Sequence, residues 1–147
     1  MNPGMNDPGM KLASPEQAEA AFYSALDKAD LAAMMAVWAE DEDIVCIHPG
    51  GPRLIGMDAV RESWRRIFAP GPHMGFQLLD VRVHGGRMLS VHNLYERITI
   101  GGQPKAHLAL ATNVYLLTPS GWRMLMHHAS PLPPDTPGPD MPIGTLH

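Results

Sequence analysis

The chain has a single cysteine, Cys46, and this scarcity limits both its architecture and its chemistry. One cysteine cannot form an intrachain disulfide, so the fold has to be held by an apolar core, and a reducing compartment is expected. Because Cys46 stands in the apolar run DIVCIH, we interpret it as a small buried hydrophobe and not as a nucleophile.

Positive charge and long apolar runs are also scarce. Eleven Lys and Arg stand against fifteen Asp and Glu, which gives a net charge of −4 and offers no basic footprint for nucleic acid or an anionic membrane. No apolar run approaches the roughly 20 residues of a membrane-spanning helix. The opening residues, MNPGMNDPGMKL, contain no apolar core of a signal peptide. We therefore expect a cytoplasmic protein that binds neither nucleic acid nor membranes.

The composition is that of one globular domain, with 45% apolar residues in a chain of 147. The two ends of the chain are rich in Pro, Gly, Asn, Asp and Met. We predict disordered tails over residues 1–13 and 131–147, the second of them proline-rich, and a folded body over residues 14–130.

Three helices are predicted in the first half of this body. Ser14 can cap the first helix ahead of Pro15, Asp30 can cap the second, and Gly56 precedes the third. Each helix has one apolar face at helical spacing. These faces contain Ala18, Phe22, Ala25, Leu26 and Ala29; Leu31, Met34, Met35 and Trp38; and Val60, Trp64, Ile67 and Phe68.

The second half changes to the periodicity of strands. One strand is predicted at 43–48, and four more at 76–84, 87–100, 106–117 and 122–130, with glycine pairs or TPSG between the last four. This order predicts an α+β fold, in which a long, curved antiparallel sheet forms a cone and the three helices pack on its concave face.

Two stretches of the sequence resemble a known family. ALDKADLAAMMAVWAEDEDIVCIHPGGPRLIGMDAVRESW and GWRMLMHHAS, together with the order of elements, resemble the SnoaL-like and ketosteroid isomerase-like branch of the nuclear transport factor 2-like superfamily. The resemblance covers nearly all of residues 14–130 and implies a cystatin-like α+β barrel, an apolar pocket and a homodimer. It implies no single reaction, because the fold hosts both enzymes and association modules.

The catalytic pattern of the ketosteroid isomerases does not carry over to this chain. The segment that holds their aspartate base corresponds to His48–Gly51, and their first-helix tyrosine corresponds to Phe22. Their protonated aspartate corresponds to Asn113, and a tyrosine of their third helix corresponds to Trp64. We therefore do not expect steroid isomerisation by that mechanism.

Two histidines are candidates for proton transfer. The resemblance places His48 at the mouth of the cone, where an imidazole can act as acid or base near neutral pH; alternatively it only fixes the turn by bonding the Gly50-Gly51 backbone. In the last strand, alternation sends Met126, His128 and Ser130 to one face and His127 to the other. By resemblance the first face lines the pocket, so His128 is the predicted second group.

Other polar and aromatic residues are predicted around the same pocket. Asn113 can donate to a carbonyl or enolate oxygen, or it can pair structurally with one of the two histidines. We also predict that Asn93 and Tyr95, and not the opposite face with His92 and Glu96, point into the pocket. The remaining predicted wall residues are Trp38, Trp64 and Tyr115; for the two tryptophans, packing is the default interpretation and a ligand platform the secondary one.

The sequence lacks the motifs of metal-binding, phosphate-binding and serine-triad sites. There is no HExxH motif, no His-x-His pair, no glycine-rich phosphate loop and no serine at a strand-to-helix elbow, so we expect no metal, no cofactor and no serine triad. The sequence predicts a domain that binds an apolar small molecule as a cofactor-free isomerase, cyclase or dehydratase. His48 and His128 would transfer protons, and Asn113 with Tyr115 would stabilise charge on oxygen. The alternative is a non-catalytic ligand-binding or dimerisation module of the same fold.

Overall fold

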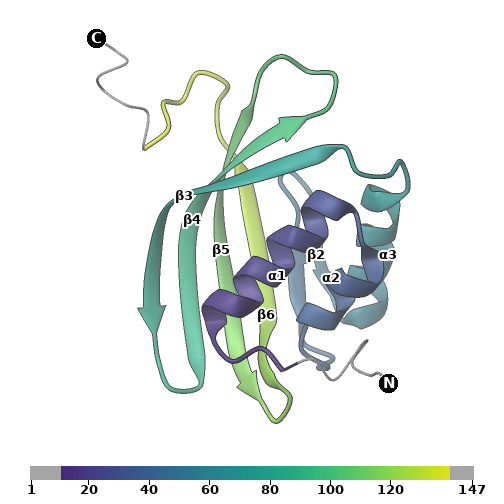
Figure 1. Ribbon diagram of the computed structural model, residues 1–147, viewed down its shortest axis with the longest axis vertical. Coiled ribbons are helices and arrows are strands. Elements are labelled where there is room, and N and C mark those ends of the chain that lie inside the picture. The colour runs from purple at the N-terminus through teal and green to yellow at the C-terminus, as the bar shows by residue number, and fades with distance from the viewer. Residues whose placement is uncertain (1–10, 140–147) are drawn as a thin grey trace.

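The computed structural model describes residues 11–139, which form three helices and one six-stranded sheet (Figure 1). The elements are α1 Pro15–Lys28, α2 Leu31–Val37, β1 Val45–Ile47, β2 Arg53–Ile55, α3 Met57–Phe68, β3 Met74–Gly85, β4 Leu89–Ile100, β5 His107–Thr118 and β6 Gly121–Pro131. The sheet is curved and unclosed, with the helices on its concave side. The predicted α+β fold is confirmed.

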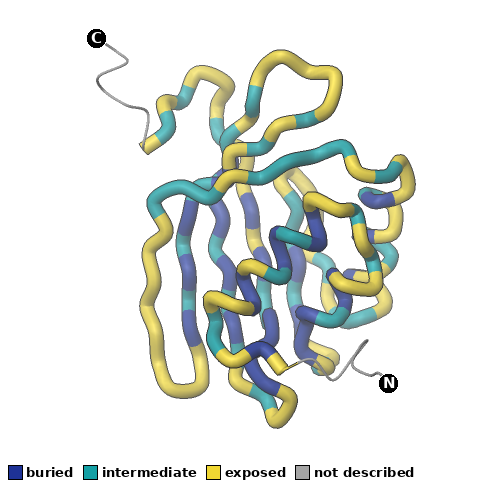
Figure 2. Tube along the Cα trace, in the orientation of Figure 1, coloured by how far each residue is buried: buried dark blue, intermediate teal, exposed yellow. Residues whose placement is uncertain are grey.

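The helices begin at the predicted caps. The Ser14 hydroxyl accepts a hydrogen bond from the Gln17 backbone N–H at 3.1 Å, and the Asp30 carboxylate accepts one from the Ala33 N–H at 3.0 Å. Such bonds satisfy donors that have no partner within the first turn. Figure 2 shows that the side of α1 facing the sheet is buried, which positions this helix across the long strands.

The sheet has the strand order β2-β1-β6-β5-β4-β3. Its pairs are antiparallel except that β1 runs parallel to β6, so the prediction of a wholly antiparallel sheet is wrong at that pair. Parallel strands become neighbours through long connections, and here the connection between β1 and β6 contains most of the domain. The segment His48–Pro52 joins β1 to the short strand β2, which the sequence pattern did not indicate.

A β-bulge at Leu125 decides which side chains of β6 face the helices. Val114 of β5 pairs with Met126, whereas Tyr115 pairs with Met124, so Leu125 has no partner in the ladder. The extra residue shifts the alternation by one position after it. The inward-facing side chains around the bulge are therefore Met124 before it and His127 and Ala129 after it, and all three are buried.

Parts of the predicted tails are included in the fold. Leu12 is buried, forms a bridge with Gly121 and accepts a hydrogen bond from the Trp122 N–H. β6 continues to Pro131. Residues 1–10 and 140–147 lie outside the described residues, so the prediction of disorder there stays a prediction. No helix within residues 11–139 has both the length and the apolar character to cross a membrane.

Candidate functional site

The structure places His127, and not His128, inside the cone. His127 is 3% exposed, whereas His128 and Ser130 are exposed and Met126 is half-buried on the outer face. The predicted orientations of His128, Met126 and Ser130 are wrong because simple alternation does not include the bulge at Leu125.

The prediction for β4 is also wrong by one residue. Asn93 and Tyr95 are half-buried on the outer face, where Asn93 donates hydrogen bonds to the Ala111 carbonyl and the Thr112 hydroxyl. The inward side chains are the completely buried His92 and Glu96. Strand alternation separates two faces without saying which is the inner one, and a shift of the register by one residue exchanges them.

The other predicted site residues do lie in the interior. Asn113 and Tyr115 are completely buried on the inner face of β5, and Trp38 and Trp64 are 1% and 2% exposed. Phe22 connects these residues, since its ring contacts Trp38 and Trp64 edge-on and His127 at 4.8 Å between centroids.

A chain of buried hydrogen bonds runs from His127 to Glu96. The Tyr23 hydroxyl donates to Glu96 Oε2 at 2.6 Å, and Asn113 Nδ2 donates to the Tyr23 oxygen at 3.0 Å. The Asn113 Oδ1 therefore faces His127 Nδ1 at 2.6 Å as an acceptor, so this ring nitrogen carries the proton. We call this series, Glu96–Tyr23–Asn113–His127, the inner chain. It fixes the neutral tautomer of His127 in which Nε2 has the lone pair.

Burial sets unusual protonation states at both ends of the inner chain. Desolvation raises the pKa of Glu96 to about 7, partly offset by the hydrogen bond from Tyr23. Desolvation and the positive charge that His48 and His128 can carry lower the pKa of His127 to about 3. Burial, followed by the charge of Glu96, also raises the pKa of Tyr23 well above its ordinary value. At neutral pH the imidazole is thus uncharged and the carboxyl is close to half ionised.

His48, directly after β1, is held as the opposite tautomer. The Ser63 hydroxyl donates its proton to the Val60 carbonyl at 2.7 Å, so its oxygen accepts from His48 Nε2 at 3.0 Å. The lone pair of His48 is then on Nδ1. Burial lowers the pKa of this half-buried histidine, which favours the uncharged ring at neutral pH. Neither alternative in the sequence analysis identified Ser63 as its partner.

Trp64 lies against both imidazoles. Its ring centroid is 4.6 Å from that of His48, at an interplanar angle of 90°, and 6.4 Å from that of His127. Among residues 11–139, no hydrogen bond reaches Nδ1 of His48 or Nε2 of His127. Two uncharged bases with unshared lone pairs therefore lie beside one indole. We call His48, Trp64 and His127 the mouth cluster.

The indole nitrogens of Trp64 and Trp38 have no partner either. Both Nε1 atoms are buried without a hydrogen bond to any described residue. An unpaired buried N–H is destabilising by about 1–3 kcal/mol, so such groups are rare in native proteins, and a water molecule or a ligand can supply the acceptor.

A second buried network lies further along the inner face. His92 Nδ1 is 3.0 Å from Glu19 Oε2 and its Nε2 is 3.1 Å from the Ser90 hydroxyl, while the Tyr115 hydroxyl donates to the same Glu19 oxygen. These contacts have the connectivity of a serine triad, which the sequence analysis did not predict. Ser90 is 1% exposed and His92 completely buried, so a substrate cannot reach the hydroxyl in this conformation. We interpret the network as support for the inner face.

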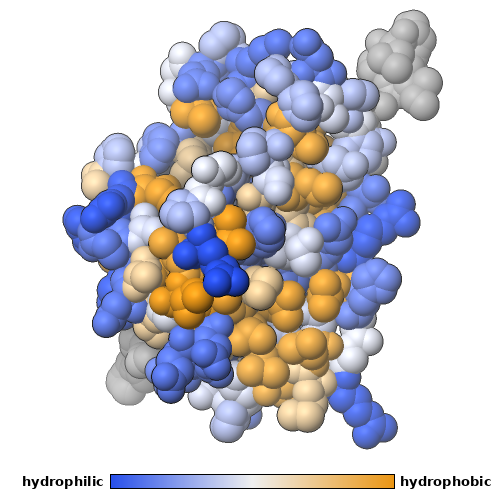
Figure 3. Space-filling model, turned by 180° about the vertical axis from the view of Figure 1, so that it is seen from behind, coloured by the Kyte–Doolittle hydropathy of each residue, from blue (hydrophilic) through white to orange (hydrophobic). Residues whose placement is uncertain are grey.

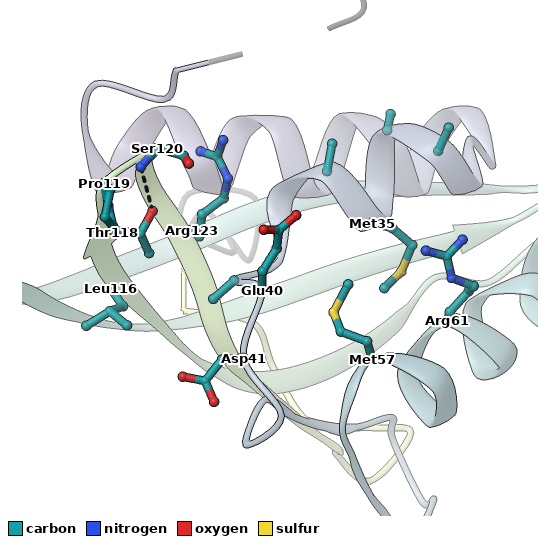
Figure 4. Close-up of a pocket in the computed structure, with 14 residues that line it drawn as sticks. Met35, Glu40, Asp41, Met57, Arg61, Leu116, Thr118, Pro119, Ser120 and Arg123 are labelled. Atoms are coloured by element: carbon teal, nitrogen blue, oxygen red, sulfur yellow. Dashed lines mark hydrogen bonds between the residues drawn. The ribbon is translucent and has the colours of Figure 1, made fainter. Parts of the chain in front are cut away.

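A pocket of about 980 Å³ lies elsewhere, between α2, the start of α3 and the β5–β6 turn (Figure 4). Its polar lining includes Glu40, Asp41, Arg61 and Arg123 around the apolar side chains of Met35 and Met57. The described residues that line it include no histidine. The mouth cluster does not border it. Within residues 11–139, no group of three or more metal-ligating side chains is present.

Sequence reasoning missed Tyr23, Glu96 and Glu19. Glu19 and Tyr23 do lie on the apolar face of α1, beside Phe22 and Leu26, and a carboxylate in that position was a signal of burial. Glu96 lies on the same face of β4 as Leu94, which gives the same signal. What the pattern could not show was that these groups find one another across 73 to 96 positions of sequence.

Comparisons with known proteins agree with the fold. A family model described as a SnoaL-like domain matches residues 16–134. A Thiobacillus denitrificans chain assigned as a calcium/calmodulin-dependent protein kinase type II association domain is 39% identical, with a TM-score of 0.78 over 84% of this chain and 99% of that one. A Streptomyces avermitilis chain assigned as a dehydratase of the nuclear transport factor 2-like family is 31% identical, with a TM-score of 0.72 over 80% and 93%.

A curated relative matches a smaller part of its own length. F-box protein SKIP8 of Arabidopsis thaliana is 27% identical over 109 residues, which are 74% of this chain and 46% of that protein. The chain thus spans about half the length of this relative. The resemblance noted from the sequence is confirmed by the family model and by these structures.

Proposed function

Because the chain belongs to the SnoaL-like domain family, whose fold encloses a core between helices and a curved sheet, we propose that it binds a small molecule at the mouth cluster and transfers protons there. The observation that carries the proposal is the pair of uncharged imidazoles, each with an unshared lone pair, on one indole. The reaction class is isomerisation or dehydration of a molecule with an acidic C–H beside a carbonyl.

The inner chain supports a catalytic role for His127. A buried carboxyl and imidazole reduce stability unless they are well paired, so apolar residues would make a more stable core. In the inner chain, an ionised Glu96 polarises Tyr23 and Asn113 so that the Asn113 carbonyl accepts more strongly from His127 Nδ1. That offsets part of the loss of basicity that burial causes at Nε2, where a proton from the ligand would arrive. Asn113 thus acts as a positioning residue, which is closer to the predicted pairing with a histidine, here His127, than to the predicted oxyanion donor.

Ligand entry has to rearrange side chains at the mouth. His48 is the half-buried member of the mouth cluster and follows β1 directly, at the start of the turn His48–Pro52. Its ring can swing outward by breaking the hydrogen bond to Ser63, at a net loss of about 1 kcal/mol, together with the longer contact of Nε2 with Cys46 Sγ at 3.7 Å. Trp64 and Phe68 then form the aromatic wall against which an apolar ligand would pack.

Hydrogen–deuterium exchange of a simple ketone tests this function without knowledge of the natural substrate. We expect the protein to accelerate exchange of the α-hydrogens of 2-indanone in D2O, followed by proton NMR. Because general base catalysis typically contributes 10²–10⁴-fold, His127→Gln and His48→Gln should each reduce the accelerated rate at least about tenfold. The exposed His84 provides the matched control, and His84→Gln should leave the rate unchanged. A rate equal to that of buffer alone contradicts the proposal.

The outer face of the sheet favours a second role, as a homodimerisation surface. Half-buried apolar side chains form cross-strand rows there, such as Val91–Val114–Met126, and Figure 3 shows apolar groups gathered over the lower half of this face. Asn93 and His128 lie in a neighbouring polar row of the same face, Asn93–Thr112–His128. A contiguous apolar surface of this kind is typical of an interface. We propose that two copies of the chain associate through it, and this role is compatible with the first.

A further inference from the structure

The hydrogen-bonding groups of the mouth cluster are unevenly distributed. Both imidazoles offer lone pairs, at His48 Nδ1 and His127 Nε2, and their N–H groups are already used by Ser63 and Asn113. The unpaired donor in the cluster is the Nε1–H of Trp64. A ligand that satisfies all three groups therefore needs one acceptor atom and at least one polarised hydrogen.

We propose that Trp64 Nε1–H donates a hydrogen bond to a carbonyl oxygen of the ligand, and that this bond makes the site selective for neutral ketones or aldehydes. The inference rests on the proposed function and adds the ligand class and a residue that determines it. Trp64 is the donor, and not Trp38, because its ring contacts both imidazoles, whereas the described ring contact of Trp38 is to Phe22.

The surrounding charges favour a neutral ligand over an anion. The ionisable groups buried with these rings include two carboxyls, Glu19 and Glu96. Arg123, the one buried arginine or lysine among residues 11–139, lines the separate pocket beside α2. A carboxylate ligand at the mouth cluster would be buried without a compensating cation from the buried side chains of residues 11–139, which is strongly unfavourable in a poorly solvated environment.

Donation from Trp64 would also assist the proton transfer. When an imidazole removes a hydrogen from the carbon beside the carbonyl, the electron pair of the C–H bond moves to the oxygen and forms an enolate. A donor already directed at that oxygen stabilises the developing charge without reorganisation. The proton resides on the imidazole and returns to carbon, so the step is balanced without another reactant.

Binding of three ligands of matched shape tests the proposal: 2-indanone, indane and indane-2-carboxylate. Since one neutral hydrogen bond contributes about 1.4 kcal/mol, we expect wild type to bind 2-indanone about tenfold more tightly than indane, and the carboxylate more weakly than either. Trp64→Phe removes the N–H and keeps an aromatic ring, so the ratio of the two affinities should fall to about one. Trp38→Phe and Trp122→Phe should keep the ratio of wild type.

The ratio is measured within one variant, so partial unfolding affects both ligands equally. Nitrogen-15 NMR of wild type gives a readout that needs no stable Trp64 variant: the indole Nε1–H of Trp64 should move downfield with 2-indanone and not with indane. Three results would overturn the assignment of the donor while leaving the proposed function intact. They are equal affinities of wild type for 2-indanone and indane, an affinity ratio that is unchanged in Trp64→Phe, and an affinity ratio that is lost in Trp38→Phe. If no ligand binds and exchange is not accelerated, the proposed function fails as well.

Discussion

At the scale of single residues, folding moves a proton between two side chains. In water, between about pH 4.5 and pH 6.5, a histidine is protonated and a glutamate is ionised. In the fold the pKa of His127 is about 3 and that of Glu96 is about 7, so over the same range the imidazole is neutral and the carboxyl carries the proton. The number of protons bound by the pair is then equal in the folded and unfolded states, and its contributions to the pH dependence of stability cancel.

Glu96→Gln should remove this cancellation. The contribution of His127 to the free energy of unfolding is fully present above the pKa of the unfolded histidine and is lost as pH falls towards 3. The contribution of Glu96 is fully present below the pKa of the unfolded glutamate and is lost as pH rises through 7. The stability of the variant relative to wild type should therefore increase by about 2 kcal/mol between about pH 4.7 and about pH 6.3. Urea unfolding at the two pH values measures it. A difference that is independent of pH would show that Glu96 is ionised throughout.

At the scale of elements, alternation is reliable only where a strand is regular. The sequence was sufficient to predict the three helices, their caps and the inward face of β5 with Asn113 and Tyr115. In β6 one unpaired residue, Leu125, exchanged the roles of His127 and His128, and no residue type in MLMHH signals a bulge. The bulge depends on long-range pairing with β5, which a single sequence does not contain.

The turn between β5 and β6 gives a prediction at this scale. Gly121 has a φ of 105°, and an added Cβ would lie 2.8 Å from the Leu12 carbonyl oxygen and 2.9 Å from its nitrogen. Gly121→Ala should therefore reduce the free energy of unfolding by about 2–4 kcal/mol, because backbone strain and a backbone clash combine.

Gly102 is the matched control for this substitution. It has a φ of 86° with open space around the position of a Cβ. Gly102→Ala should reduce the free energy of unfolding by only about 1 kcal/mol, which is the strain of positive φ alone. Equal losses in the two variants, measured by urea unfolding, would show that Leu12 does not pack on the turn.

At the scale of the whole molecule, the outer face of the sheet determines the proposed association. Val114 lies at the centre of the row Val91–Val114–Met126, and Val114→Arg would place a charge in the interface. We expect wild type to be a dimer and this variant a monomer by light scattering coupled to size exclusion. Val83→Arg is the control, because Val83 is 46% exposed on β3 and pairs with the inward-facing His92. A monomeric wild type, or a dimeric Val114→Arg variant, contradicts the proposed interface.

The two proposed roles use opposite faces of one sheet, and the first depends on the protonation states inside. Long-range nitrogen-15 NMR of the histidine rings measures these states directly, because it distinguishes the two neutral tautomers from the charged ring. We expect His127 to be neutral with the proton on Nδ1 at every pH above about 4, and His48 to be neutral at pH 7 with the proton on Nε2. A His127 that carries its proton on Nε2, or that becomes charged near pH 6.5, would contradict the mouth cluster as a pair of uncharged bases.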